Sequence, residues 1–183
     1  MYYSRHIKKK LTLSIIVKRV VLLIGVFSLL FFIESRAQIS TRKLEAIYMY
    51  NFTKYINWQS EGSAFVIGVL GENKVAGELS ENLQNKEVKG KPIQVQNISS
   101  VAEAKKCQIL YLPKSNSGQL QSILDAVSNI DVLVVAEEDL AAQGASVSFF
   151  IDGSKLRFKI NKDALDKAGL QASSNLLSLA VVI

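Results

Sequence analysis

Three consecutive carboxylates, Glu137, Glu138 and Asp139, are the first side chains in this sequence whose types and spacing could do chemistry. They follow the apolar run VLVVA, and open α/β sheets place their sites where strands end. Carboxylate oxygens suit a hard cation such as Mg²⁺ or Ca²⁺, and carboxylates alone could also serve a hydrolase. The other interpretation is a solvated loop or the start of a helix, and it leads us to expect no metal site.

Two glycines, Gly68 and Gly71, lie where an apolar run gives way to a helical pattern, as in a phosphate-binding loop. Their spacing matches neither G-x-G-x-x-G nor G-x-x-x-x-G-K-[ST]. A tight turn between strand and helix accounts for both, and we expect no cofactor. A small-molecule site in the adjacent crevice stays an alternative.

Nucleophilic catalysis by a Ser-His or Cys-His pair is excluded in the mature chain. His6 is the only histidine, Cys107 is the only cysteine, and His6 lies in a segment that we expect to be removed. A zinc site of histidines and cysteines and an internal disulfide are excluded for the same reason. Cys107 begins the apolar run CQILYLP, so we expect it to be buried in a strand, with an intermolecular disulfide as the alternative.

Residues 1–37 have the pattern of a cleaved secretory signal peptide. A basic start precedes the apolar run of residues 20–33, which is shorter than the roughly 20 residues of a spanning helix, and Ser35 and Ala37 suit a signal-peptidase site. The alternative is an uncleaved anchor. Cleavage removes seven of the 22 basic and one of the 16 acidic residues, leaving fifteen of each. The net charge of +6 therefore belongs to the signal, and no nucleic-acid partner is indicated.

Residues 38–183 are predicted to form a single α/β domain, because short apolar strands alternate with amphipathic helices. The expected strands are 64–71, 91–98, 107–113 and 131–137, and the expected helices between them are 74–87, 99–106 and 118–129. The pattern predicts a three-layer sandwich: a mostly parallel sheet of five to six strands with flanking helices and a C-terminal β-hairpin.

That hairpin is predicted over residues 145–160, with Asp152 and Gly153 as a two-residue type I′ turn. This turn pairs Phe149 with Leu156 and makes one face of the hairpin entirely apolar. The other face carries the polar and basic residues Ser146, Ser148, Lys155, Arg157 and Lys159 together with Phe150. Either a helix covers this face, or Phe150, Lys155 and Arg157 form part of an interface with a partner.

The segment 43–58 has helical spacing and is rich in aromatic residues. Its core-facing side chains are predicted to be Leu44, Ile47, Tyr48, Phe52, Tyr55 and Ile56. At about 100° per residue, Tyr50 falls about 200° from Tyr48 and cannot share that face. It either packs under another element or is presented to a partner, for which tyrosine is a favoured anchor.

The C-terminal residues predict two short helices. Asn161 suits the N-cap of the first and Gly169 its C′ position, while Ser173 or Ser174 can cap a second helix over residues 175–182. The second helix would pack Leu176, Leu177 and Ala180 against the sheet. Leu170 and Asn175 could contribute to a contact surface beside the hairpin.

Several phrases of the mature chain resemble the YfiR family of exported bacterial regulators. They are AIYMYNFTKYINW (46–58), FVIGVLG (65–71), CQILYLP (107–113), VLVVAE (132–137), RFKIN (157–161) and AGLQASSNLLSLA (168–180). The resemblance implies a periplasmic, non-catalytic α/β protein, often dimeric. The best-understood member holds an inner-membrane diguanylate cyclase inactive by binding its periplasmic domain. This sequence lacks the further cysteines of that member's disulfides, so redox control is not implied.

The sequence thus predicts a periplasmic regulatory or binding protein without catalytic activity, whose partner is the periplasmic domain of an inner-membrane sensor. The candidate contact residues are Tyr50, Phe150, Lys155, Arg157, Leu170 and Asn175. The alternative function is that of a periplasmic small-molecule binding protein that feeds a sensor kinase or a transporter. A ligand that raises the melting temperature would distinguish it.

Overall fold

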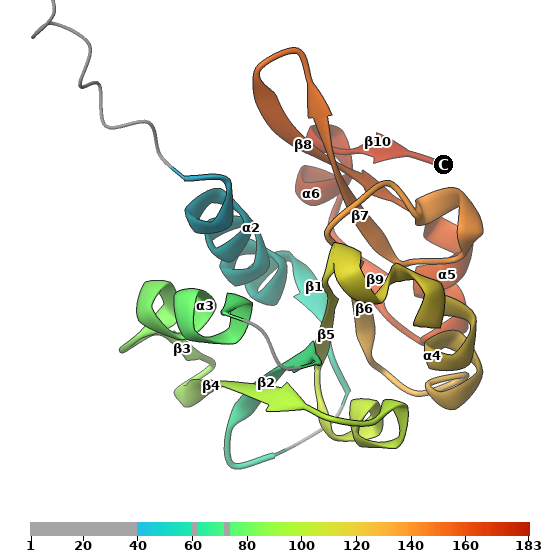
Figure 1. Cartoon of the computed structure of the whole chain (residues 1–183). Helices are drawn as coiled ribbons and strands as arrows, with labels where there is room; N and C mark the ends of the chain where they lie inside the picture. Colours follow the sequence, from blue (N-terminus) through green and yellow to red (C-terminus); the bar gives the residue numbers. More distant parts are fainter. Residues whose placement is uncertain (1–39, 60–61, 72–73) are drawn as a thin grey trace, which may run out of the picture. The chain divides into compact units, whose positions relative to one another are not determined.

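The computed structural model describes residues 40–59, 62–71 and 74–183, all of which belong to one compact unit, Ile39–Ile183. The expected signal peptide lies outside the described residues. Five parallel strands form the centre of the main sheet: β4 (Lys91–Ile98), β2 (Phe65–Leu70), β5 (Ile109–Leu112), β6 (Leu133–Ala136) and β7 (Val147–Asp152). Figure 1 shows these strands with helices on both faces, as the sequence predicts.

The order across the main sheet is β10-β8-β7-β6-β5-β2-β4-β3. Strand β8 (Lys155–Ile160) pairs antiparallel with β7, and the two edge strands, β3 (Glu87–Val88) and β10 (Val181–Val182), have two residues each. A separate ladder joins β1 (Ile56–Asn57) to β9 (Gln171–Ala172). The predicted five to six strands are therefore present, and the additional ones within the described residues are too short to give a sequence pattern.

Each face of the sheet has its own hydrophobic core. Helices α2 (Thr41–Tyr55), α3 (Val75–Leu83), α5 (Lys162–Lys167) and α6 (Ser174–Leu179) bury side chains against one face. Helix α4 (Leu120–Ala126) and the 3₁₀ helix η1 (Val101–Lys106) cover the other. Two further 3₁₀ turns are η2 (Lys114–Gln119) and η3 (Ala141–Gln143). The side chains of β5 and β6 alternate between the two cores and are all buried, which explains their continuous apolar sequences.

The hairpin of β7 and β8 is confirmed, but its predicted register was wrong by one residue on each strand. Phe149 lies opposite Phe158, and Asp152 pairs with Lys155, so the two-residue loop is Gly153-Ser154. Gly153 has φ +61° whereas Ser154 has no positive φ, the pattern of a type II′ turn with glycine first. The turn and the register both move by one residue, so every side chain stays on its predicted face; the apolar face packs on α2.

The buried face of α2 differs from the prediction. Ser40 caps the helix by accepting a hydrogen bond from the backbone of Lys43. The buried side chains are Glu45, Ala46, Met49, Phe52 and Thr53. Ile47 and Tyr55, which the sequence placed in the core, are 44% and 40% exposed. The helix packs Ala46, Met49 and Phe52 against the sheet, and this rotation turns Ile47 and Tyr55 toward solvent.

The C-terminal segment has the predicted caps and one unpredicted element. Asn161 and Ser173 each accept a hydrogen bond from the first turn of their helices, and Gly169 has φ +67°. Helix α6 ends at Leu179 rather than at residue 182, because Val181 and Val182 pair parallel with Lys159 and Ile160 of β8. Among the helices of the described residues, we find none with the length and apolar character needed to cross a membrane.

Candidate functional site

The carboxyl ends of β2, β5 and β6 meet where the chain order of the sheet reverses. The chain passes from β2 to β4 on one side and then returns to β5 on the other side of β2. Open α/β folds place their sites at such a switch point. Arg42 and Glu45, at the start of α2, are positioned over these strand ends by the packing of α2 on the sheet.

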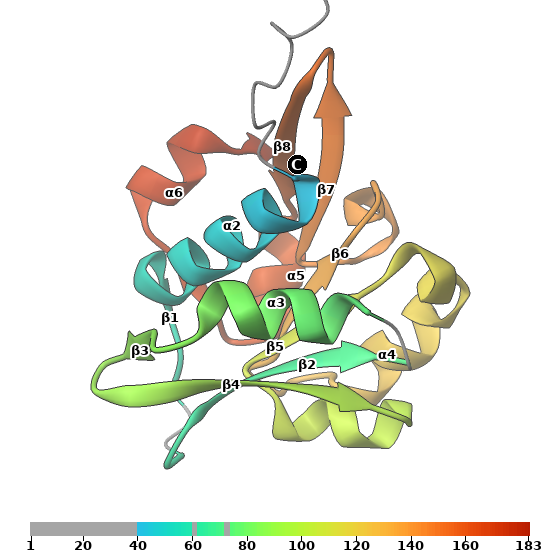
Figure 2. The ribbon, with the colours of Figure 1, turned by 60° about the vertical axis from the view of Figure 1, so that its left-hand side comes forward.

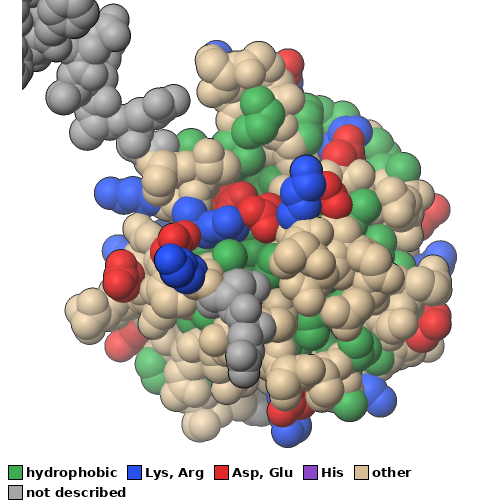
Figure 3. Space-filling view, in the orientation of Figure 1, with side chains coloured by type: hydrophobic (Ala, Val, Ile, Leu, Met, Phe, Trp, Pro, Cys, Tyr) green, Lys and Arg blue, Asp and Glu red, His purple; other side chains and the backbone are tan. Residues whose placement is uncertain are grey.

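Arg42 connects four elements at this point. Its guanidinium pairs with Glu45 of α2 at 2.6 Å, Glu78 of α3 at 3.3 Å and Glu137, directly after β6, at 2.8 Å. It also donates a hydrogen bond to the hydroxyl of Tyr111 in β5. We call Arg42, Glu45, Tyr111 and Glu137 the Arg42 network. Figure 3 shows acidic and basic side chains interleaved at the centre of this face, without a large patch of either sign.

Glu45 is the buried acid of this network, with 2% of its surface exposed. Its carboxylate accepts hydrogen bonds from Tyr111 at 3.0 Å and from Arg42. Burial raises the pKa of Glu45 to about 7, against the opposing effect of Arg42. Burial and the neighbouring Glu45 also raise the pKa of Tyr111, so its hydroxyl stays protonated and donates to Glu45. Glu45 therefore titrates in the neutral range.

The three carboxylates that follow β6 each have different partners. Glu137 accepts a hydrogen bond from the backbone of Lys114 at 2.8 Å in addition to its pair with Arg42. Glu138 pairs with the Lys114 amine at 3.5 Å, and Asp139 pairs with Lys159 at 2.5 Å. Nowhere in the described ranges do three or more acidic, histidine or cysteine side chains gather as metal ligands would.

The local structure requires glycine at both Gly68 and Gly71, for a different reason at each position. A Cβ on Gly68 would collide with the Sγ of Cys107, so the glycine lets β2 approach this thiol. Gly71 has φ +86°, which favours glycine, and it faces the side chain of Asn116. Cys107 is 2% exposed, as predicted, but it is the C-cap of η1 and precedes β5 instead of lying in the strand; its burial raises the pKa of the thiol to about 11. Such a thiol is protonated and shielded, which disfavours an intermolecular disulfide.

Three of the predicted contact residues lie together on the hairpin. Phe150 is directly opposite Arg157, and Lys155 is two residues further toward the tip. Arg157 pairs with Asp152 at 2.9 Å, and the Lys159 amine lies 5.4 Å from the centre of the Phe150 ring. Lys155 and Arg157 are exposed and Phe150 is half-buried, so no helix among the described residues covers this part of the hairpin.

The other three predicted contact residues lie elsewhere. Tyr50 is half-buried, with the amines of Lys54 and Lys86 at 4.2 and 5.5 Å from its ring centre. Lys86 precedes β3, at the opposite edge of the sheet from the hairpin. Asn175 is exposed on α6. Leu170 is 1% exposed and packs in the core, so the chain does not present it at a surface.

The sequence reasoning did not include the Arg42 network. Its one local signal is the i, i+3 pair of Arg42 and Glu45, but the predicted helix began at Lys43 and left Arg42 outside it. The contacts with Tyr111 and Glu137 join residues 69 and 95 positions apart, which no local pattern reveals. Chemically, the network surrounds one cation with three carboxylates, which ties α2 to the strand ends and leaves the guanidinium engaged with acids of the same chain.

Comparisons with known proteins agree with this architecture. A solved structure described as an ABC domain in complex with L-Trp, from Streptococcus pneumonia, is similar with a TM-score of 0.55 and 14% identity. The similarity covers 75% of this chain and 60% of that one, and it concerns the α/β fold alone. No curated protein sequence matches the chain. Residues 42–181 match the YfiR/HmsC-like family, so this chain belongs to that family.

Proposed function

We propose that this protein is a periplasmic regulator without catalytic activity, which binds the periplasmic domain of an inner-membrane sensor and restrains it. The observation that carries the proposal is the family match over residues 42–181. The sensor class that the family suggests is a diguanylate cyclase. A signal peptide over residues 1–37 would deliver the protein to the compartment where such a domain lies.

The tip of the β7–β8 hairpin is the contact surface that we propose for the sensor. Figure 1 shows the hairpin projecting past the helices. Ile151, next to Phe150, is 59% exposed, and Arg157 supplies a guanidinium on the opposing strand. The tip therefore exposes an aliphatic side chain on one face of the hairpin and an aromatic ring with an arginine on the other, and aromatic and arginine side chains often anchor protein interfaces. Lys155 adds a positive charge at the rim.

The regulatory mechanism is a shift between conformations of the sensor. A protein that binds the inactive conformation more tightly than the active one favours the inactive conformation by the ratio of the two affinities. By linkage, any signal that stabilises the active conformation weakens binding of the regulator to the same extent. No covalent chemistry is needed, which agrees with a site whose guanidinium is already paired with acids of the same chain.

The decisive experiment is capture of the sensor from detergent-solubilised envelopes of the source cells. The bait is the protein purified from the periplasm, compared with an Ile151→Ser, Arg157→Ala variant. Removing two interface anchors is expected to reduce recovery of the sensor about tenfold or more. The recovered protein must carry a cyclase domain, and the wild-type bait must lower its synthesis of cyclic di-GMP in isolated membranes.

A Lys105→Ala variant, altered at an exposed position of η1, is the matched control and should behave like the wild type. The proposal fails if the wild-type bait leaves cyclase activity unchanged. If the wild type, the double variant and the control inhibit the cyclase equally, the hairpin is not part of the contact surface.

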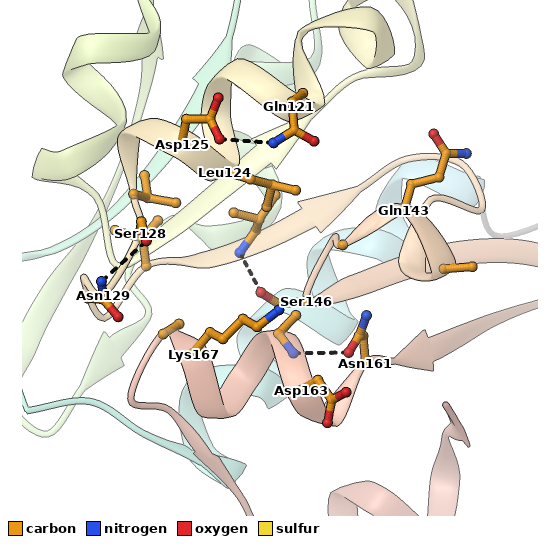
Figure 4. A pocket seen from close by; sticks show the side chains of 17 residues that line it. Gln121, Leu124, Asp125, Ser128, Asn129, Gln143, Ser146, Asn161, Asp163 and Lys167 are labelled. Carbon is orange, nitrogen blue, oxygen red and sulfur yellow. Dashed lines mark hydrogen bonds between the residues drawn. The ribbon is translucent and has the colours of Figure 1, made fainter.

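A second candidate function, small-molecule binding, is favoured by a groove of about 460 Å³ between α4 and α5. Figure 4 shows the Lys167 side chain reaching across this groove toward Ser146. Its floor is apolar, with Val132 and Val134, and Ser146 is 3% exposed beneath it. Most of the other lining side chains are polar or charged, among them Asp125, Asn161, Asp163 and Lys167, so a ligand of this groove would be a polar small molecule.

The small-molecule fraction of a periplasmic extract is the probe for this groove. If the groove holds a ligand, the extract should raise the melting temperature of the wild type by a few degrees. An Ala164→Trp variant, which fills the groove from α5, should show no such rise. An equal rise in both proteins would place the ligand elsewhere.

A further inference from the structure

Tyr50 lies between two lysine amines at the surface. The amine of Lys54, in the last turn of α2, is 4.2 Å from the centre of the Tyr50 ring, and the amine of Lys86, just before β3, is 5.5 Å from it. The face of an aromatic ring attracts cations, so Tyr50 holds two like charges near each other. Both lysines are exposed, whereas Tyr50 is half-buried. The tyrosine therefore collects positive charge at the surface.

The turn between β3 and β4 adds two more lysines. Val88 pairs with Lys91, which leaves Lys89 and Gly90 as the loop. Their φ angles of +51° and +77° are those of a type I′ turn. Lys89 and Lys91 border a small hollow together with Thr53 of α2. Figure 2 shows the ends of α2 and α3 and the strand β3 gathered at one end of the molecule. We call these residues the basic corner: Tyr50, Lys54, Lys86, Lys89 and Lys91.

The lysines of the basic corner have no counter-charge of their own. The ion pairs found among the described residues use other cations, namely Arg42, Lys114, Arg157 and Lys159. In β3, Val88 points toward the core, so its neighbour Glu87 points away from Tyr50. Glu81 of α3 borders the groove beside Ile93 and forms no ion pair with these lysines. The basic corner is therefore a local excess of positive charge.

We propose that the basic corner binds the surface of a phospholipid bilayer that contains anionic headgroups. Lysine is depleted in interfaces between proteins, where arginine is preferred. Its flexible side chain carries a point charge that can reach separate phosphates of a diffuse anionic surface. The hollow beside Lys89 and Lys91 has about 50 Å³, which is less than a bound peptide segment needs. The composition and the shape of the corner thus fit a charged surface better than a protein partner.

A second tyrosine adds to the fit with a bilayer. Tyr55 follows Lys54 in α2 and is 40% exposed. Tyrosine rings favour the boundary between lipid and water, because the ring is apolar and the hydroxyl is polar. Each lysine held near an anionic bilayer is expected to raise the partition coefficient about fivefold. The basic corner therefore predicts reversible binding that depends on anionic lipid and on salt.

Binding at the basic corner would leave the β7–β8 hairpin accessible. Strand β3 and the hairpin strand β8 lie toward opposite edges of the main sheet. A regulator held at the membrane meets an inner-membrane sensor at a higher effective concentration than one that diffuses freely. This consequence rests on the proposed function. The lipid binding itself does not, and vesicles without any protein test it separately.

The test is sedimentation of the protein, purified from the periplasm, with sucrose-loaded vesicles. Vesicles of phosphatidylglycerol and phosphatidylcholine are compared with vesicles of phosphatidylcholine alone. The wild type should sediment with the anionic vesicles only. Its partition coefficient should fall at least tenfold as the salt concentration rises from about 50 to 500 mM, because salt screens exposed charges. A wild type that binds neither kind of vesicle, or both equally, overturns the proposal.

Lys89→Asn separates the loss of charge from a loss of folding. Asparagine followed by Gly90 is a preferred sequence for a type I′ turn, so this variant should be at least as stable as the wild type. Its partition coefficient on anionic vesicles should nevertheless fall about fivefold. Thermal unfolding measures the first expectation and sedimentation the second. An Lys89→Asn protein that binds the vesicles as well as the wild type contradicts the proposal.

Two double variants and a control test the lysines beside Tyr50. Lys54→Glu, Lys86→Glu should lower the partition coefficient at least tenfold, whereas Lys54→Arg, Lys86→Arg keeps both charges and should retain binding. The control, Lys105→Glu, Lys106→Glu, makes the same change in charge at exposed positions of η1, on the other face of the sheet, and should bind nearly as well as the wild type. An equal loss in the control would contradict a localised surface. If only the Lys54→Glu, Lys86→Glu variant loses inhibition of the cyclase and no protein binds vesicles, the basic corner contacts a protein instead, and the proposal is wrong.

Discussion

Replacing Arg42 with alanine is expected to reduce the free energy of unfolding by about 3 kcal/mol at pH 8, which is among the larger effects of a single substitution. The guanidinium is the cation that pairs with the buried Glu45 and also holds Glu137 and Glu78. Without it, Glu45 must either remain charged in the core without its cation or bind a proton against the pH of the solution. Urea denaturation of the purified protein measures the loss.

The same substitution should cost less at pH 5.5, because Glu45 is then protonated in both proteins and needs no cation. The double variant Arg42→Ala, Glu45→Gln removes both charges and should be more stable at pH 8 than Arg42→Ala alone. Two results at pH 8 would contradict this interpretation of the network. One is a loss of less than about 1 kcal/mol in the free energy of unfolding on Arg42→Ala; the other is a double variant that is no more stable than Arg42→Ala alone.

Glu45 should make the stability of the wild type depend on pH between about 4.5 and 7. Its pKa in the folded protein is about 7, above the ordinary value of 4.5, so the folded state binds more protons in this interval. The contribution of Glu45 to the free energy of unfolding is therefore fully present below about pH 4.5 and is lost as the pH rises through 7. At 1.36 kcal/mol per pKa unit, the change is at most about 3 kcal/mol.

The measurement compares the free energy of unfolding of the wild type with that of Glu45→Gln at several pH values from 4.5 to 8. Glutamine keeps the shape and cannot ionise, so the slope due to Glu45 disappears while the slopes of the other acids remain. The difference between the proteins should change steadily in favour of the variant as the pH rises. A difference that does not vary with pH would contradict a pKa near 7.

Both expected effects follow from the position of α2. Glu45 and Arg42 lie in its first two turns, and their partners follow β5 and β6 or belong to them. The charged pair is therefore held at the switch point of the sheet only while α2 is docked. In the neutral range, the proton on Glu45 and the docking of α2 are coupled.

Local patterns were sufficient where the interactions themselves are local. Val75, Leu79 and Leu83 were expected to face inward from their helix and are buried. Asn161 and Ser173 cap their helices as expected, because a cap needs only the residues of one turn. The faces of the hairpin were correct even though the loop was placed one residue early, since alternation along a strand does not depend on where the turn begins.

Local patterns failed where distant segments compete for the same residue. Val181 and Val182 continue a helical pattern, but pairing with β8 makes them a strand. Ile47 and Tyr55 are as apolar as the residues beside them, and only the docking of α2 decides that they remain exposed. Gln171 and Ala172 lie between the two predicted C-terminal helices, yet they form a strand that pairs with β1, more than a hundred residues earlier in the chain.

The sequence by itself determined the α/β class, the positions of the central strands along the chain, the hairpin and the resemblance to the YfiR family. These depend on periodicity, caps and glycine positions, which act over a few residues. Only the tertiary structure decided the Arg42 network, the need for Gly68 beside Cys107 and the basic corner. Each depends on which segments meet in space. Burial then gives a contact such as Glu45 with Arg42 its strength, because water no longer screens it.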